Sequence, residues 1–163
     1  MLRNILSGKT CAECRKCCVF DRYDIWEAPV FSAENLAVMR ENGSDADFVS
    51  VSGGFMFKAE SFGAAQEFAC PALGENGCIL GDEKPPECRM FPLRVMDKDG
   101  VRVIAADTVC TVFAAEHLSE LVRFVRSDGF ADRLFACADE NPHIVRPYLC
   151  GLPIAAYEPP ERQ

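Results

Sequence analysis

The sequence lacks the long apolar runs of membrane and secreted proteins. No segment approaches the roughly 20 consecutive apolar residues that a membrane-spanning helix needs. Residues 1–10 contain neither the apolar stretch nor the cleavage site of a secretory signal peptide. We therefore expect a soluble, cytoplasmic protein.

Signatures of common enzymes are also missing. The chain has no glycine-rich nucleotide-binding motif, and its two histidines, His117 and His143, do not form an HExxH pair. It contains no internal repeat and no low-complexity segment. A net charge of −8 disfavours nonspecific attraction to nucleic acid or anionic lipid. We expect no nucleic-acid or membrane partner and assign no catalytic residue, so an enzyme is the less favoured reading; the charge identifies no protein partner.

Cysteine, in contrast, is abundant, with 10 among 163 residues. Four of them, Cys11, Cys14, Cys17 and Cys18, lie together in the run CAECRKCC. Thiolates separated by two residues can converge on one soft metal ion or iron–sulfur cluster. In a reducing cytoplasm, clustered cysteines bind metal more often than they form disulfides. The run therefore predicts part of a metal site.

Most of the other cysteines have glycine or proline beside them. Cys70 precedes a proline, Cys78 follows a glycine, and Cys88 lies in KPPECRMFP at residues 84–92. Such neighbours favour tight turns, in which backbone N–H groups can point at sulfur and stabilise its negative charge. Cys110 follows a predicted hairpin. These cysteines are the expected companions of the first run.

The order of these motifs resembles the zinc- or iron-chelating domain of the YkgJ-type cysteine-cluster proteins. The resemblance covers residues 11–110 and rests on CxxCxxCC at 11–18, CPxL at 70–73, GCI at 77–79, PxxCRxFP at 85–92 and the later Cys110. It implies metal binding, with the ligands Cys11, Cys14, Cys17, Cys18, Cys70, Cys78, Cys88 and Cys110. Cys137 and Cys150 fall outside the pattern, and we expect both to be small buried hydrophobic residues.

The identity of the metal stays open at this point. Cys11, Cys14 and Cys17 with a remote fourth cysteine are spaced as in ferredoxin-type ligand sets, which favours a [4Fe–4S] cluster or iron, but zinc uses the same CxxC spacing. Neighbouring side chains tend to diverge, so either one of Cys17 and Cys18 is not a ligand or the cysteines form two centres. Arg89, beside Cys88, is a candidate for offsetting thiolate charge at the bound cofactor.

Local patterns predict an α+β fold, a small single domain over residues 1–156 with metal-bound loops. Its expected elements are a helix at 33–42, hairpins at 48–59 around Gly53–Gly54 and at 92–106 around residues 97–100, and helices at 112–127, 130–138 and 143–149. The motif region is 11–110, the helical C-terminal part is 112–150, and residues 157–163 form a mobile tail. Trp26 and the phenylalanines are expected to fill the core.

Two classes of function follow. The first is a metal-binding module whose centre is structural or handles electrons or metal. The second is an enzyme or enzyme subunit, because longer proteins resembling this family include flagellin lysine N-methylases, which use S-adenosylmethionine. The missing nucleotide-binding signature places this second class behind the first.

Overall fold

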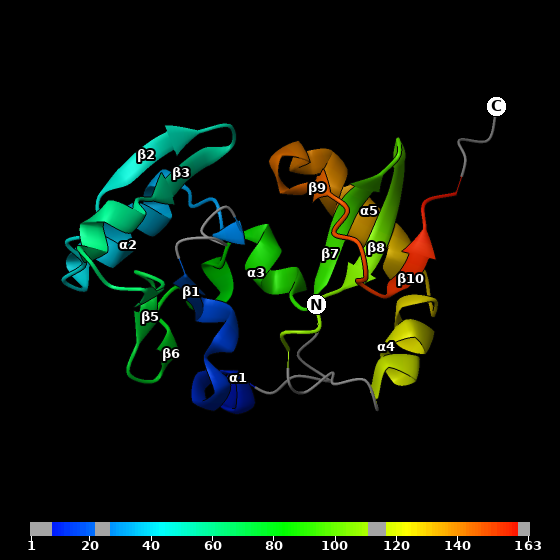
Figure 1. Ribbon diagram of the computed structural model, residues 1–163, viewed down its shortest axis with the longest axis horizontal. Coiled ribbons are helices and arrows are strands. Elements are labelled where there is room, and N and C mark those ends of the chain that lie inside the picture. Colours follow the sequence, from blue (N-terminus) through cyan, green and yellow to red (C-terminus); the bar gives the residue numbers. More distant parts are fainter. Residues whose placement is uncertain (1–7, 22–26, 111–116, 160–163) are drawn as a thin grey trace. The chain divides into compact units, whose positions relative to one another are not determined.

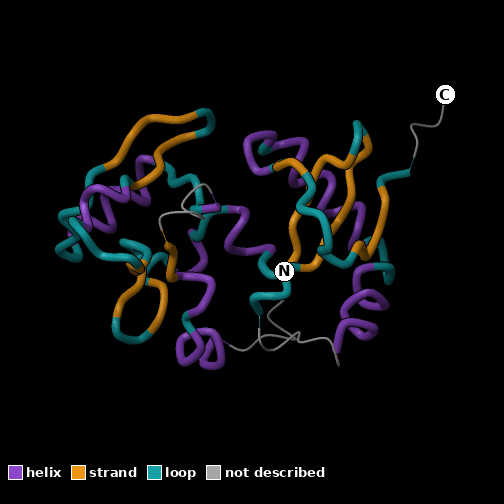
Figure 2. The backbone as a smooth tube through the Cα atoms, viewed as in Figure 1, coloured by secondary structure: helices purple, strands orange, loops and turns teal. Residues whose placement is uncertain are grey.

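The computed structural model describes residues 8–21, 27–110 and 117–159. The chain divides into two compact units, Met1–Arg89 and Met90–Gln163, each described by itself below. Helices and small, mainly antiparallel sheets are combined (Figures 1 and 2), which confirms the α+β class. Within the described ranges, no helix has the length and apolar character needed to cross a membrane.

The first unit consists of short elements joined by turns (Figure 1). Three two-stranded antiparallel sheets pair β1 with β4, β2 with β3, and β5 with β6. The elements in chain order are α1 (Gly8–Cys14), η1 (Lys16–Cys18), β1 (Val19–Asp21), α2 (Ala33–Glu41), β2 (Phe48–Val51), β3 (Gly54–Phe57), η3 (Ala59–Phe62), β4 (Glu67–Ala69), β5 (Leu73–Gly74), β6 (Gly77–Cys78), η4 (Gly81–Glu83) and α3 (Pro86–Met90).

Helix α2 confirms the prediction for residues 33–42 almost to its ends. The Asn35 N–H donates to the Ser32 hydroxyl at 3.2 Å, and the Ser32 N–H donates to the Asn35 side-chain oxygen at 3.3 Å, which together form a capping box. Gly43 follows the helix with φ 84°, a left-handed conformation that glycine adopts without strain. The buried Asn35 side chain also donates to the Glu83 carbonyl at 2.9 Å and so ties α2 to η4.

The first predicted hairpin is present, but its turn lies one residue earlier than expected. Val51 pairs with Gly54, so Ser52 and Gly53 form the two-residue loop. Gly54 belongs to the strand because it pairs with Val51, and it is a glycine because a Cβ atom there would lie 2.3 Å from the Phe31 carbonyl oxygen. Close backbone approach, rather than a turn, explains this second glycine.

Phenylalanine side chains fill the core of the first unit, as predicted. Phe57 is fully buried, and its ring centroid lies 5.6 to 6.4 Å from four other rings, those of Phe20, Phe31, Phe62 and Phe68. Such tilted and edge-on arrangements are the favoured geometries for aromatic pairs. Trp26, also predicted to be a core residue, lies outside the described residues.

The second unit is a four-stranded sheet with two α-helices (Figure 1). The strand order is β10–β8–β7–β9, in which only β9 is parallel to its neighbour. Its elements are β7 (Leu93–Lys98), β8 (Val101–Ala106), α4 (Leu118–Val125), α5 (Phe130–Glu140), η7 (Pro142–Ile144), β9 (Arg146–Pro147) and β10 (Ile154–Tyr157).

Three C-terminal predictions differ from the structure. In the second hairpin the strand pairing extends further than expected and the loop is shorter, with only Asp99 and Gly100 between its strands. The predicted helix at 143–149 is wrong: only η7 is helical, and β9 follows, because Pro147 removes a donor and obstructs a continuing helix. Of the helix expected at 112–127, α4 is observed from Leu118, and residues 111–116 lie outside the described residues.

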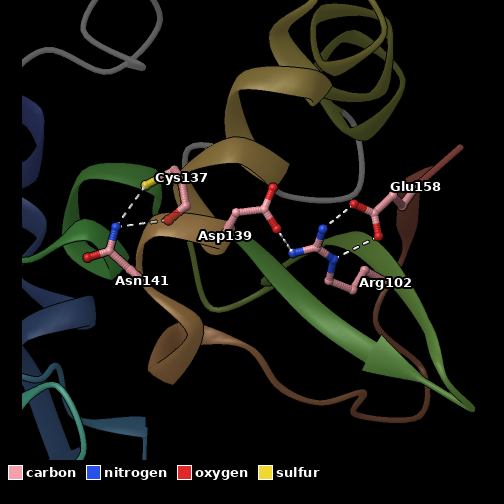
Figure 3. A network of polar contacts seen from close by, with 5 residues as sticks. All are labelled: Arg102, Cys137, Asp139, Asn141 and Glu158. Atoms are coloured by element: carbon pink, nitrogen blue, oxygen red, sulfur yellow. Dashed lines mark hydrogen bonds and ion pairs between the residues drawn. The ribbon is translucent and has the colours of Figure 1, made fainter. Parts of the chain in front are cut away.

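An ionic network fastens strand β10 to the hairpin and to α5 (Figure 3). The Arg102 guanidinium donates through Nε to a Glu158 carboxylate oxygen at 2.7 Å, through Nη2 to the other Glu158 oxygen, and through Nη1 to Asp139 at 2.6 Å. These bonds, first of all those to Glu158, raise the pKa of Arg102. Glu158 and Tyr157, at the start of the expected tail, are thus held to the second unit.

The two cysteines outside the motif pattern differ from each other. Cys137 is buried on α5, as predicted, and the Asn141 amide donates to its carbonyl at 2.9 Å and lies 3.9 Å from its sulfur (Figure 3). Cys150 is exposed, so the prediction of burial is wrong for this residue. It follows β9 in the connection to β10, where no helix forms to bury it.

Candidate metal centre

The N-terminal cysteine run is folded back on itself by a left-handed residue. Cys11 and Cys14 lie on α1, Arg15 has φ 58°, and Cys17 and Cys18 follow on η1. The Arg15 side chain holds this bend in place, because its Nε donates to the Ala12 carbonyl at 2.8 Å and its Nη2 donates to the Glu75 carbonyl. One arginine therefore joins the cysteine run to the turn between β5 and β6.

The side chains of Cys17 and Cys18 lie close together, although the sequence analysis expected them to diverge. Their sulfur atoms lie 3.9 Å apart, close to the ~3.8 Å that separates two thiolates in a tetrahedral site with metal–sulfur bonds of about 2.3 Å. The reversal at Arg15 and the tight η1 turn bring these adjacent side chains together. The expected divergence of these two side chains is therefore wrong, and whether both bind one ion stays a prediction.

Strand pairing brings Cys70 next to Cys18. Strands β1 and β4 are antiparallel, with Val19 opposite Ala69, and the Cys70 N–H continues this ladder by donating to the Cys18 carbonyl at 2.7 Å. The pair forms here because Phe20 and Phe68, which are directly opposite, are both buried in the phenylalanine core. The core of the unit thus sets the register of the two cysteines.

The β5–β6 hairpin carries Cys78 back toward Cys70. Leu73 pairs with Cys78, and the Leu73 N–H donates to the Cys70 carbonyl at 2.8 Å. Gly77, just before Cys78, has φ 104°, and a Cβ atom there would lie 3.1 Å from the Cβ of Ala12. A glycine at this position lets the hairpin pack closely against α1, between Cys11 and Cys14.

Cys88 lies on the short helix α3, directly after Glu87. Burial raises the pKa of its thiol well above the ordinary range, and the charges of Cys70, Glu87, Cys78 and Cys17 raise it further. Cys88 as a residue is exposed to solvent, and the burial that raises its pKa is that of the sulfur atom among protein atoms. Its thiol therefore belongs electrostatically to the same group as those of Cys70, Cys78 and Cys17.

Six thiols share this electrostatic environment. They are those of Cys14, Cys17, Cys18, Cys70, Cys78 and Cys88. Burial, with the charges of Cys78 and Cys17, raises the pKa of Cys70 to about 12, although a hydrogen bond from the Ala72 N–H works in the opposite direction. The pKa of Cys17 is also raised. The largest cause is its hydrogen bond with the Cys18 thiol, followed by burial and by the charges of Cys18 and Cys14.

These donors fit a soft or borderline metal in their chemistry. Thiolates are ligands for zinc, iron and iron–sulfur clusters, and the Ala72 N–H that points at the Cys70 sulfur is of the kind that stabilises bound thiolate. As they stand, no three His, Cys, Asp or Glu side chains of the described chain are arranged to hold a metal ion. Metal binding would therefore require the side chains to move closer together.

The remaining predicted site residues are placed differently. Cys11 is exposed on α1, and Arg89 is exposed at the end of α3, one residue beyond Cys88. Cys110 is buried in the second unit, after β8 and the ion pair of Asp107 with Arg94 at 2.9 Å. Their roles at a metal stay predictions.

Sequence reasoning missed two residues of this region. Arg15 holds the bend of the cysteine run, and Glu87 places a carboxylate beside Cys88. Their positions inside the motifs CAECRKCC and PPECR were the available signal. No protein family, curated protein or solved structure matches the chain. The resemblance to YkgJ-type proteins thus rests on the cysteine motifs alone.

Proposed function

We propose that this protein is a cytoplasmic member of the YkgJ-type family that binds a metal centre through cysteine thiolates. The observation that carries the proposal is the 3.9 Å separation of the Cys17 and Cys18 sulfur atoms, together with the backbone hydrogen bond that holds Cys70 beside Cys18. Without a cation, each thiolate formed there makes the next one more costly. A bound metal reverses this effect, because a coordinating thiol loses its proton outright.

Cys17, Cys18 and Cys70 form the heart of the proposed centre. The first two have neighbouring sulfur atoms, and the third is fixed to Cys18 through a backbone hydrogen bond. Cys14, Cys78 and Cys88 provide further donors, and Cys11 and Cys110 are included on the resemblance. The spacing of the first cysteines favours a [4Fe–4S] cluster or iron, with zinc as the close alternative.

The role that fits this donor set is structural or one of electron or metal handling. Thiolates that fill all coordination positions leave no position for a substrate, as in structural sites. The metal would supply either cross-linking of distant segments or, for an iron–sulfur cluster, a redox centre. The protein's own part is to hold the donors and supply N–H groups to sulfur, with Cys18, Cys70 and Cys78 packed with the phenylalanine core.

Anaerobic purification followed by metal analysis, acid-labile sulfide assay and visible absorption tests the proposal. Iron with equal sulfide supports a cluster, and stoichiometric zinc in a colourless sample supports a zinc site. We expect Cys18→Ser and Cys70→Ser to lose metal, whereas Cys150→Ser, at an exposed cysteine outside the motifs, keeps it. A wild-type protein that takes up neither metal, or variants that all retain it, would contradict the proposal.

A further inference from the structure

Cys17 and Cys18 form an accessible pair of adjacent thiols. Their sulfur atoms lie 3.9 Å apart, Cys17 is exposed and Cys18 is half-buried. The backbone brings them together, because the left-handed Arg15 precedes η1 and the Cys18 N–H closes this turn by donating to the Arg15 carbonyl at 2.9 Å. Two thiols held this close can join to each other when an oxidant reaches them, and exposure allows a small oxidant to do so.

Cys70, which lies beside Cys18 at the end of the β1–β4 ladder, is less suited as a disulfide partner. Its N–H donates to the Cys18 carbonyl, so the two residues are a hydrogen-bonded pair, in which side chains lie farther apart than in the other kind of antiparallel pair. Cys70 is also buried, which limits the access of an oxidant to its sulfur. Cys17 is therefore the favoured partner of Cys18.

A disulfide between adjacent residues is strained. Neighbouring Cα atoms lie ~3.8 Å apart across an ordinary peptide bond, whereas those of most disulfides are about 4.4–6.8 Å apart. The ring that closes would contain the Cys17–Cys18 peptide unit, whose N–H holds the η1 turn. Such strain makes a disulfide easier to reduce, which is a property of labile and regulatory disulfides rather than of structural ones.

We propose that Cys17 and Cys18 are a redox-sensitive pair that forms a reversible disulfide by exchange with a low-molecular-weight disulfide. This role needs only the two neighbouring sulfur atoms and does not rest on the proposed metal centre. In a metal-bound protein, the same oxidation would remove two of the proposed donors. Reduction would return them.

The exchange takes place in two steps. One cysteine sulfur, as its thiolate, attacks a sulfur of the small disulfide, and the first small thiol leaves. The second cysteine thiolate then attacks the cysteine sulfur of this mixed disulfide, forms the Cys17–Cys18 bond and expels the second small thiol. The pair loses two electrons and two protons, and the small disulfide gains them as two thiols.

Mass spectrometry of a single tryptic peptide tests this role. Trypsin cleaves after Lys16 and Arg22, so peptide 17–22 contains Cys17 and Cys18 and no other cysteine. Metal-free, full-length protein is equilibrated anaerobically with glutathione buffers of increasing oxidised fraction, blocked with iodoacetamide and digested. We expect the peptide to lose both carbamidomethyl groups and two hydrogen atoms in the oxidising buffers, and to regain both groups after transfer to reduced glutathione.

Controls separate this pair from the other thiols and from the unfolded chain. Cys150→Ser, at an exposed cysteine of the second unit, should leave the oxidation of peptide 17–22 unchanged. Cys18→Ser should abolish the internal disulfide and give a mixed disulfide of Cys17 with glutathione. Wild-type protein unfolded in guanidinium lacks the η1 turn, so a smaller fraction of its peptide 17–22 should be internally oxidised in the same buffer.

Several results would overturn the role, and the main ones need no variant. These are a peptide 17–22 that keeps both carbamidomethyl groups in the most oxidising buffer, a disulfide that links it mainly to the peptide of Cys14 or Cys70, resistance to reduced glutathione, or equal internal oxidation of the folded and unfolded protein. Each would leave the metal proposal intact, because metal content is measured separately. Conversely, a protein that takes up no metal would leave this role intact.

Discussion

Truncation of Phe57 tests whether the phenylalanine core, and not a metal alone, stabilises the first unit. The Phe57 side chain has no solvent exposure, and its ring centroid lies 5.6 Å from that of Phe20, 6.0 Å from those of Phe62 and Phe68, and 6.4 Å from that of Phe31. Phe57→Ala would remove all of these contacts and leave a cavity at their centre.

The expected loss is large for a domain of this size. Replacing a buried phenylalanine by alanine costs about 3–5 kcal/mol, and four ring contacts place Phe57 toward the upper end, since an aromatic pair contributes ~0.5–1.5 kcal/mol beyond its buried area. Whole domains are stable by only about 5–15 kcal/mol. Phe57→Leu keeps most of the apolar volume and should cost less, about 1–2 kcal/mol.

Urea unfolding of the metal-free protein, followed by circular dichroism under anaerobic conditions, measures these losses. Val49→Ala is the control, because Val49 is 40% exposed on β2 of the same unit, and its change should stay within about 0.5 kcal/mol. A loss below about 1 kcal/mol in Phe57→Ala would refute the reasoning, because a well-packed core cannot tolerate such a cavity at that cost. The first unit would then have no metal-independent core.

Three further predictions concern charge and backbone. The pKa of Cys70 is raised to about 12, above the ~8.5 of an unfolded thiol. The metal-free protein should therefore keep the stability that this shift contributes below about pH 8.5 and lose it as the pH rises toward 12, by up to about 1.4 kcal/mol per pH unit. Cys70→Ser should reduce this slope in urea titrations at several pH values. Arg102→Lys should lower the unfolding free energy by about 1 kcal/mol in thermal melts, because lysine cannot bind Glu158 with two parallel bonds and the site is partly exposed; an unchanged melting temperature would show that the pair contributes nothing. Gly77→Ala should cost about 1–3 kcal/mol and weaken metal uptake, because of its φ of 104° and the 3.1 Å approach to Ala12; metal content and stability equal to wild type would refute this.

The elements that could be predicted from sequence are those with local signals. Ser32 and Gly43 enclose α2 within one short stretch, so both ends of that helix could be predicted. The turn at Ser52 and Gly53 could not, because Gly54 is required by the backbone of Phe31, which is distant in the chain. At the C-terminus, the helix predicted at 143–149 does not extend beyond Ile144, because Pro147 obstructs it.

The candidate site shows the same division. The order and spacing of the cysteines indicated which residues to consider, since motif spacing is a local property. The sequence did not indicate that the sulfur atoms of Cys17 and Cys18 would be neighbours, because this depends on the left-handed Arg15. The position of Glu87 depends on a hydrogen bond to Val30, which no local pattern encodes.

The pairing of β1 with β4 has a consequence for the order of events during synthesis. The N-terminal cysteine run leaves the ribosome first, but the strand that fixes Cys18 beside Cys70 lies at residues 67–69. At ~5–20 residues per second, the early thiols wait several seconds for their partners. For the metal centre proposed above, loading before that moment would involve only the first run, so the proposal predicts that the centre is filled after β4 has been made.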